Sequence, residues 1–271
     1  MYKYIGILTD FGLRDPYVGI MKSVILKMNP DVKIIDISHE IPSFSINTAA
    51  YILLSVLDYF PKNTIFLVVV DPGVGSKRRA IVVKTRRYLF VGPDNGVLYP
   101  AIIYDGIEHI RLIENERLFL KPTSNTFHGR DIFAPVAALL SKNIPLDVIG
   151  KSLSIRDIVK LDFNIVEIED LYQSESLCGK VIYIDKFGNV ALNVRVSNYE
   201  ALPLNSEVEI KINDKIFKAL TSRSFSLINR GEIALYVNSF RFLEIGVNMG
   251  NAADKLRLNI GDKICIRILR A

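Results

Sequence analysis

The chain has 271 residues and a composition close to the globular average, with 49% hydrophobic and 23% charged residues. A chain of this length buries about three quarters of its unfolded surface and needs neither a metal nor a disulfide to fold, and roughly 150 residues per domain predicts about two domains. These figures exclude a disordered or coiled-coil protein. The net charge of +5 comes from scattered Lys and Arg, which argues against nucleic acid as a partner.

The sequence also argues against a membrane protein and against a metal site. The longest apolar runs, such as residues 65–70, are far shorter than the roughly 20 residues of a membrane span, and the first residues do not resemble a secretory signal. Cys178 and Cys265 are too few for a disulfide scaffold or a cysteine zinc site, and three histidines without local pairing argue against catalytic zinc. We therefore expect a cytoplasmic protein that binds no membrane and no metal.

The first half of the chain alternates strand-like and helix-like segments, which predicts an α/β domain with a central, mostly parallel sheet between helices. Short apolar or β-branched runs predict strands at residues 4–9, 33–37, 65–70, 80–84 and 88–91. Apolar residues at helical spacing predict helices at residues 18–28, 46–60 and 129–142, the second stopped by Pro61.

The pattern changes after residue 164, which predicts a second domain of a different kind. Residues 167–176 are acidic and polar and are typical of a linker, which we place at residues 165–177. Short strands separated by turn residues then predict a small β-barrel or sandwich, and we expect a smaller C-terminal β-barrel over residues 178–271, following a first domain of residues 1–164. The expected strands are residues 180–185, 190–196, 207–212, 215–220, 233–238, 242–247 and 263–269.

Several polar motifs follow predicted strands, where open α/β sheets bind their ligands. They are Thr9-Asp10-Phe11-Gly12, the run that begins at Asp71, Gly92-Pro93-Asp94-Asn95-Gly96, and Thr126-Phe127-His128-Gly129-Arg130-Asp131. Each could be structural instead, because Asp often forms a turn or caps a helix after a strand. Among the histidines, His109 suits a structural role, His39 is ambiguous, and His128 at a helix entrance suits a pocket.

Together these motifs resemble one family, the adenosine-forming S-adenosylmethionine hydrolases, also called S-adenosylmethionine hydroxide adenosyltransferases, which are relatives of the fluorinases and chlorinases. The resemblance spans nearly the whole chain, and the number and order of the motifs make it specific. It covers Thr9-Asp10-Phe11-Gly12 with Asp15, Tyr17 and Gly19, residues 37–42, 70–79, 92–96 and 126–135, Asp185-Lys186-Phe187-Gly188-Asn189, and residues 243–253.

The resemblance implies a catalytic trio at Asp71, Arg78 and His128, and their presence points to the water-using branch rather than the halogenating one. It implies attack of water at C5′ of the ribose of S-adenosylmethionine, which releases methionine and leaves adenosine. The alternatives are a halide-using transferase that makes a 5′-halo-5′-deoxyadenosine, and a protein that binds S-adenosylmethionine or adenosine without turnover. No cofactor is implied, since S-adenosylmethionine is the substrate.

The resemblance also implies substrate contacts in both halves of the chain and a homotrimer with active sites between subunits. The implied contacts are Asp10 for the ribose diol, Phe44 and Phe127 for the pocket and ribose, Phe187 and Phe225 stacked on the adenine, Asn189 hydrogen-bonded to it, Asp185 and Ser239 for the methionine amino group, and Asn248, Gly250 and Ala252 in a loop beside the adenine.

One departure from the family pattern concerns the methionine carboxylate. The family usually has Gly two residues after the Ser, and halogenases bind the carboxylate through an Arg directly after it, whereas this chain has Phe240 and Arg241.

Overall fold

A computed structural model describes residues 2–169, 176–197, 199, 202–223 and 227–269. The chain divides into two compact units, residues 1–162 and 163–271. The helices are α1 (Tyr17–Met28), α2 (Ile46–Val56), α3 (Tyr99–Asp105), α4 (Ala134–Ser141) and α5 (Ala252–Leu256). The strands of the first unit are β1 (Tyr4–Thr9), β2 (Lys33–Ser38), β3 (Thr64–Val69), β4 (Ala80–Thr85), β5 (Leu89–Pro93) and β6 (Ile107–Leu112).

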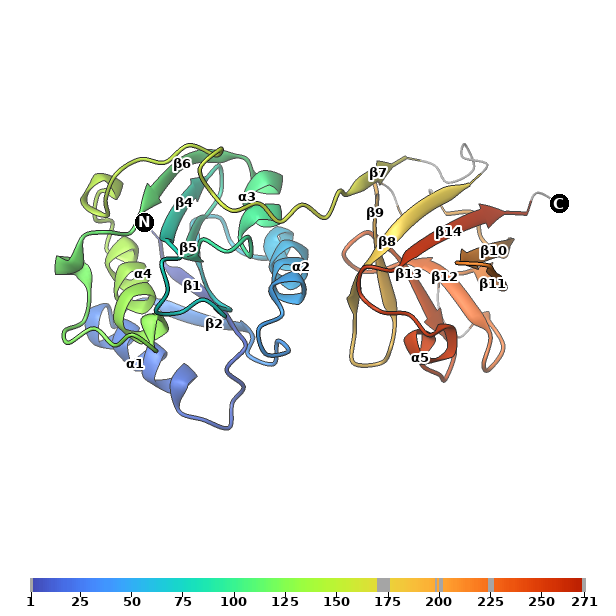
Figure 1. The fold of residues 1–271 in the computed structure, drawn as a ribbon, viewed down its shortest axis with the longest axis horizontal. Coiled ribbons are helices and arrows are strands. Elements are labelled where there is room, and N and C mark those ends of the chain that lie inside the picture. The colour runs from blue at the N-terminus through green and yellow to red at the C-terminus, as the bar shows by residue number, and fades with distance from the viewer. Residues whose placement is uncertain (1, 170–175, 198, 200–201, 224–226, 270–271) are drawn as a thin grey trace. The chain divides into compact units, whose positions relative to one another are not determined.

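The first unit is a six-stranded sheet with helices on both faces, as the alternating sequence pattern predicts (Figure 1). The strand order is β2-β1-β3-β5-β4-β6, and β2, β1, β3 and β5 run parallel while β4 is antiparallel to both of its neighbours. Helices α1 and α4 cover one face, and α2 and α3 cover the other (Figure 1). Strand β3 is buried along its whole length, which explains its uninterrupted apolar sequence.

The two faces of this sheet have different cores. On one face, Met21 and Ile25 of α1 and the alanine-rich α4 pack against Ile7, Leu67 and other alternate residues of the central strands. The opposite face carries an aromatic stack in which the rings of Phe66 and Phe90 lie parallel at 5.2 Å. The parallel strands β2, β1, β3 and β5 end at the same edge of this sheet, so the loops that follow them start from a well-packed core.

The second unit is a closed β-barrel, which confirms the predicted fold class. Its strands are β7 (Val166–Ile168), β8 (Leu177–Ile184), β9 (Val190–Val196), β10 (Glu207–Ile212), β11 (Lys215–Thr221), β12 (Ile233–Val237), β13 (Phe242–Val247) and β14 (Lys263–Ile268). The order β13-β12-β11-β10-β14-β8-β9 closes because β9 also pairs with β13, and the short β7 adds to β9 outside the closed ring.

Three details differ from the sequence-based expectation. The helix expected at residues 46–60 ends as an α-helix at Val56 and continues as a 3-10 turn to Tyr59. Residues 166–168, expected in the linker, form β7 against β9. Cys178 and Cys265 face each other across β8 and β14 and form a disulfide, which the sequence pattern did not predict because strand register brings the two residues together.

Among the residues that the structure describes, none of the helices combines the length and apolar character of a bilayer span. The same described residues contain no group of three His, Cys, Asp or Glu side chains arranged to hold a metal ion.

Candidate active site

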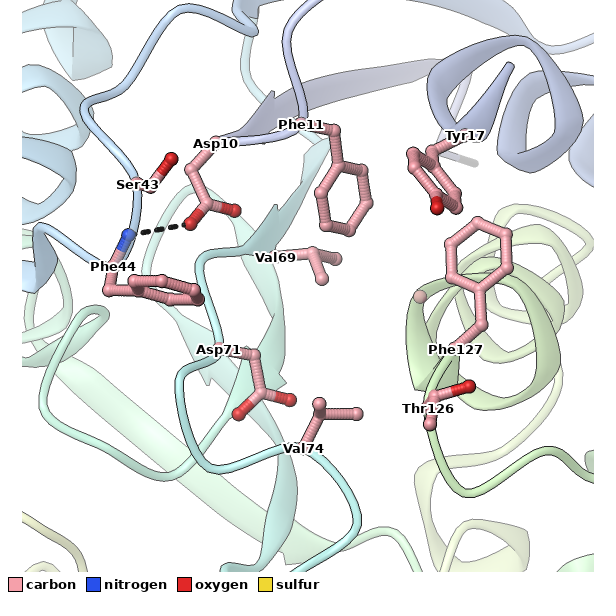
Figure 2. A pocket seen from close by; sticks show the side chains of 11 residues that line it. Asp10, Phe11, Tyr17, Ser43, Phe44, Val69, Asp71, Val74, Thr126 and Phe127 are labelled. Carbon is pink, nitrogen blue, oxygen red and sulfur yellow. Dashed lines mark hydrogen bonds between the residues drawn. The ribbon is translucent and has the colours of Figure 1, made fainter. Parts of the chain in front are cut away.

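A cavity of about 370 Å³ opens at the carboxyl edge of the parallel strands of the first unit (Figure 2). Its volume falls in the range of about 300–1,000 Å³ that is usual for small-molecule sites. The lining comes from the loops after β1, β2 and β3 and from the loop before α4. The lining residues are Asp10, Phe11, Tyr17, Ser43, Phe44, Val69, Asp71, Val74, Thr126, Phe127 and Gly129.

Asp10 is held by the loop opposite. Its Oδ2 accepts a hydrogen bond of 2.8 Å from the backbone N–H of Phe44, as Figure 2 shows. Phe44 adopts a positive φ of 66°, a conformation that costs a non-glycine residue energy, and its side chain is 67% exposed. Figure 2 shows the second carboxylate oxygen of Asp10 directed away from Phe44, on the side of the cavity that Asp10 lines, so one acceptor orients the side chain and the other can accept from a ligand.

Asp71 points into the cavity and is gripped from one side by Arg78. The Nε of Arg78 lies 2.8 Å and 3.0 Å from the two carboxylate oxygens of Asp71, and one terminal nitrogen bonds to Oδ2. The two side chains are only 5% and 10% exposed. A two-pronged guanidinium contact fixes both the charge and the orientation of a carboxylate.

Arg78 also binds His128, so that one guanidinium connects the acid and the imidazole. Its terminal nitrogen lies 3.0 Å from Nδ1 of His128. Burial, and next the positive charge of Arg78, lower the pKa of His128 below its ordinary value of 6.5. The imidazole is therefore neutral at pH 7, and because Nδ1 accepts from the guanidinium, the ring proton lies on Nε2.

Two glycines allow these loops to come together. Gly75 has a φ of 76°, and a Cβ there would lie 2.4 Å from the backbone oxygen of Asn125, so only glycine lets the Asp71 loop approach the His128 loop. At Gly129 the constraint is weaker: a Cβ would lie 3.1 Å from Sδ of Met21 and 3.4 Å from Cγ1 of Val69, which is tight side-chain packing.

His128 directly precedes a π-helical turn, Gly129–Phe133, which runs into α4. The sequence predicted a regular helix from residue 129, and the wider turn was not visible in the apolar spacing. Such turns are common at functional sites because they displace one side chain from the regular helical path. Buried Asp131 anchors the loop, since its carboxylate accepts from the backbone N–H of Ser124 at 2.8 Å and pairs with Arg130.

Asn95, which the sequence offers only as a member of the motif at residues 92–96, supports the position of Asp71. Its side-chain amide donates a 2.8 Å hydrogen bond to the carbonyl of Val70, the residue just before Asp71. Its amide oxygen accepts from the backbone N–H of Val97 at 3.1 Å. Asn95 therefore fixes the point at which the chain leaves β3.

One wall of the cavity is aromatic. The rings of Phe11, Tyr17 and Phe127 contact one another with centroids 5.2 to 5.9 Å apart, in edge-on or tilted arrangements. Figure 2 shows the three rings on the side of the cavity that lies across from Asp10 and Phe44. With Val69 and Val74 they give the two carboxylates apolar surroundings.

The remaining expected contacts belong to the second unit, where Asp185 organises a tight turn. Its Oδ1 accepts from the backbone N–H groups of Phe187 and Asn189 at 2.8 and 2.9 Å, and its Oδ2 accepts from the Asn189 amide at 2.9 Å. The Phe187 ring at the tip is 65% exposed. Such a turn presents an aromatic face and an amide side by side.

The turn packs directly against the loop that carries Asn248 and Ala252. The backbone N–H of Ala253 donates a 3.0 Å hydrogen bond to the carbonyl of Gly188. Asn248 is tied down by its amide, which donates to the carbonyl of Ile228 at 2.7 Å. The structure thus brings together Asp185, Phe187, Asn189 and the Asn248–Ala252 loop, whereas Phe225 lies outside the described residues.

Ser239 lies in a turn that is stabilised by hydrogen bonds to the side chain of Asn238. The Asn238 amide oxygen accepts from the backbone N–H groups of Phe240 and Phe242 at 2.9 and 3.0 Å. Its amide nitrogen donates to buried Glu244 at 2.7 Å. Burial raises the pKa of Glu244, and the negative charge of Asp185 adds to the increase. Two carboxyl groups therefore lie near this turn, which suits a cationic ligand group.

Known proteins resemble this chain over both units. Residues 5–150 match a family model described as the SAM hydroxide adenosyltransferase N-terminal domain, and residues 179–265 match the model of its C-terminal domain. The chain is 37% identical over 270 residues to the (R)-S-adenosyl-L-methionine hydrolase of Methanocaldococcus jannaschii, with 96% of this chain and 94% of that protein covered.

Two further proteins match this chain over nearly its full length. The (R)-S-adenosyl-L-methionine hydrolase of Salinispora tropica is 34% identical, with 96% of each chain covered. A crystal structure of a conserved protein of Thermotoga maritima superposes with a TM-score of 0.87 at 41% identity, covering 97% of this chain and 99% of that one. Fluorinases also match, at 21 to 24% identity.

Proposed function

We infer the function of this chain from the premise that it belongs to the SAM hydroxide adenosyltransferase family, where SAM is S-adenosyl-L-methionine. The chain is an enzyme that hydrolyses SAM to adenosine and L-methionine. Relatives named as hydrolases are 33 to 37% identical to it over nearly the full length, while fluorinases are more distant. The family and activity expected from the sequence motifs are therefore confirmed. The geometric observation that fits this activity best is a cavity carboxylate, Asp71, held by a guanidinium.

We propose that Asp71 activates the attacking water. Its carboxylate accepts a proton from water as the oxygen forms a bond to C5′ of the ribose. The C5′–S bond breaks, its electron pair returns to sulfur, and methionine leaves as a neutral thioether. The leaving group needs no proton, so no general acid is required, and the proton on Asp71 passes to solvent after the reaction.

Arg78 and His128 prepare this carboxylate and the water. Arg78 pairs its positive charge with the carboxylate of Asp71 and fixes the direction of its oxygens. His128, with its proton on Nε2, can hold the water oxygen while Asp71 takes the proton. Holding the nucleophile in line with the C5′–S bond converts an encounter in solution into a step within one complex.

The apolar lining assists because charge disappears in the reaction. A water that is losing its proton to a carboxylate attacks a sulfonium, so the separated charges of the ground state diminish in the transition state. Bulk water stabilises separated charges, and the wall of Phe11, Tyr17 and Phe127 limits its access. The chemistry needs no cofactor beyond the substrate itself.

We propose that Asp10 binds the ribose diol beside Phe44 and Phe127. In the second unit, Phe187 and Phe225 would stack on the adenine, and Asn189 with the loop of Asn248 and Ala252 would bind its polar edge. Asp185 and Ser239 would bind the methionine ammonium group, which is supported by the two carboxyl groups near that turn. These roles assign the ribose and the reacting carbon to the first unit and the ends of the substrate to the second.

We further propose a homotrimer in which the cavity of one copy is completed by the second unit of its neighbour. The exposed Phe44 and Phe187 rings support this, because both are proposed substrate contacts and each is open to a partner surface. Asp71→Asn and Asn189→Ala variants, each impaired alone, should regain activity when co-refolded at equal ratio. Random assembly restores about a quarter of the sites if each combines two chains, and restores none if each site is built from a single chain.

Product analysis tests the proposed reaction. The purified protein, incubated with SAM, should release adenosine and methionine in equal amounts, and the yield of adenosine should not fall when chloride or fluoride is added. The Asp71→Asn variant should lose turnover far more than SAM affinity. A 5′-halo-5′-deoxyadenosine as main product, or bound SAM that stays intact, would refute the proposal.

A further inference from the structure

A buried chain of polar contacts lies beneath the loop that carries Asp10. Thr9 is the last residue of β1, and His39 directly follows β2, and both are buried. The Thr9 hydroxyl lies 2.8 Å from Nδ1 of His39. These are polar side chains in the core of a parallel sheet, where an unsatisfied polar group is costly. Neither residue belongs to the cavity lining or to the reaction described above.

His39 holds the Asp10 loop at two points. Its backbone carbonyl accepts a 2.7 Å hydrogen bond from the backbone N–H of Gly12. Its imidazole fixes the Thr9 hydroxyl, which lies 3.4 Å from the backbone N–H of Phe11. Asp10 is thus bracketed by residues that His39 contacts, directly or through Thr9.

The contact that Nε2 of His39 makes determines which tautomer of the imidazole faces Thr9. Nε2 of His39 lies 3.0 Å from Asp36 Oδ1, an electrostatic contact that falls outside good hydrogen-bond geometry, and Lys22 donates to the other Asp36 oxygen at 2.6 Å. Burial opposes ionisation of Asp36, but the hydrogen bond from Lys22 and the close approach of the His39 imidazole hold its pKa below the ordinary value. An ionised carboxylate favours the His39 tautomer with the proton on Nε2, which leaves Nδ1 to accept the Thr9 hydroxyl.

We propose that His39 is a positioning residue for substrate binding: through Thr9 and Gly12 it sets the loop that presents Asp10 to the ribose diol. The inference rests on the proposed function, in which Asp10 binds that diol. The carboxylate of Asp10 is already tied to Phe44 across the cavity. A shift of the loop by a few tenths of an ångström would therefore change the angle at which Asp10 meets both hydroxyl groups.

Two pairs of variants of the full-length protein separate the relevant contact from general packing. Asparagine at position 39 places an amide oxygen where Nδ1 lies, whereas glutamine places its amide near Nε2, so His39→Asn keeps an acceptor for Thr9 and His39→Gln does not. At position 9, Thr9→Val removes the hydroxyl at almost constant volume, and Thr9→Ser keeps it. If His39→Gln does not fold, the Thr9 pair tests the same contact.

The readout is calorimetric binding of adenosine compared with 2′,3′-dideoxyadenosine, which lacks the diol. We expect His39→Gln and Thr9→Val to weaken adenosine binding about five- to tenfold, the effect of about one hydrogen bond, with no change for the dideoxy ligand. His39→Asn and Thr9→Ser should bind both ligands like the wild-type protein.

Two results would overturn the proposal in distinguishable ways. Equal losses for both ligands would make His39 a general structural residue and leave the role of Asp10 intact. A wild-type protein that binds both ligands equally, or binds neither, would remove the diol contact of Asp10 and with it both the proposed substrate contact and the positioning role.

Discussion

Replacing Arg78 by lysine tests how the reacting carboxylate is held. Lysine keeps the positive charge but offers one nitrogen, whereas the guanidinium contacts both oxygens of Asp71 and Nδ1 of His128. The substitution therefore removes at least one hydrogen bond to an ionised group and the bridge to the imidazole, while the net charge of the site stays the same.

The size of the effect follows from these contacts. A hydrogen bond to a charged group contributes about 1.5–3 kcal/mol, so loss of one should raise the barrier by about 1.5–3 kcal/mol, which lowers kcat about 10- to 150-fold. Arg78 stands outside the cavity lining, so KM should change little. A loss confined to kcat indicates an interaction that matters in the transition state.

Steady-state release of adenosine by Arg78→Lys measures this directly, with thermal unfolding to check the fold. Arg79→Lys is the matched control, because Arg79 also pairs with a buried carboxylate, Asp94 at 2.7 Å, but this ion pair is not in the lining. The control should keep kcat. Wild-type kcat in Arg78→Lys, an equal loss in both variants, or a rise in KM alone would refute the reasoning.

Three other predictions concern titration and stability. By NMR, the His128 imidazole should titrate below pH 6.5, and lower still in Asp71→Asn, which removes a charge that favours the imidazolium; a midpoint at or above 6.5 would contradict the assigned surroundings. Because burial raises the pKa of Glu244, the native state binds its proton more tightly than the unfolded state does. The contribution of Glu244 to the free energy of unfolding should thus fall as pH rises above 4.5. Glu244→Gln should flatten the pH dependence measured by denaturant titrations, and a slope unchanged by the substitution would argue against the raised pKa. Replacing Cys178 and Cys265 by serine should lower the free energy of unfolding by about 2–4 kcal/mol, and a reductant should destabilise the wild-type protein but not the variant; equal stability of the two would count against the disulfide.

The sequence predicts the local elements well where one force dominates. Residues 65–70 are apolar without interruption because β3 is buried on both faces, and the observed strand differs by one residue. The π-helical turn after His128 was not predictable, because it depends on how Asp131 and Gly129 pack against neighbouring loops rather than on apolar spacing. The three-residue β7 was missed because its alternating Val-Glu-Ile sequence is too short to predict a strand, and only pairing with β9 creates it.

Closure of the barrel and the disulfide depend on register, which local sequence does not contain. Strand β9 pairs with β13 across about fifty intervening residues. The disulfide requires Cys178 and Cys265 to lie exactly opposite each other on β8 and β14. Both features follow from tertiary pairing, so sequence patterns could predict a barrel but not its closing strands.

The candidate site also combines features that local sequence predicts with features that depend on tertiary contacts. The rule that ligands bind beyond the carboxyl ends of parallel strands places Asp10 and Asp71 at one edge, and the structure places both in one cavity. The contact of Arg78 with both Asp71 and His128, fifty positions further along the chain, requires the close approach that Gly75 permits. The supporting roles of Asn95 and His39 lie in hydrogen bonds to backbone groups of the loops that follow β3 and β1, for which the sequence carries no signal.

The central claim, that Asp71 directs a water molecule at C5′ of SAM, is tested most directly by a single turnover in oxygen-18 water. The account predicts that the label appears in the 5′-hydroxyl group of adenosine, at the enrichment of the solvent, and that Asp71→Asn abolishes its appearance on the same timescale. Adenosine without the label, or labelled product at an undiminished rate in Asp71→Asn, would contradict the account.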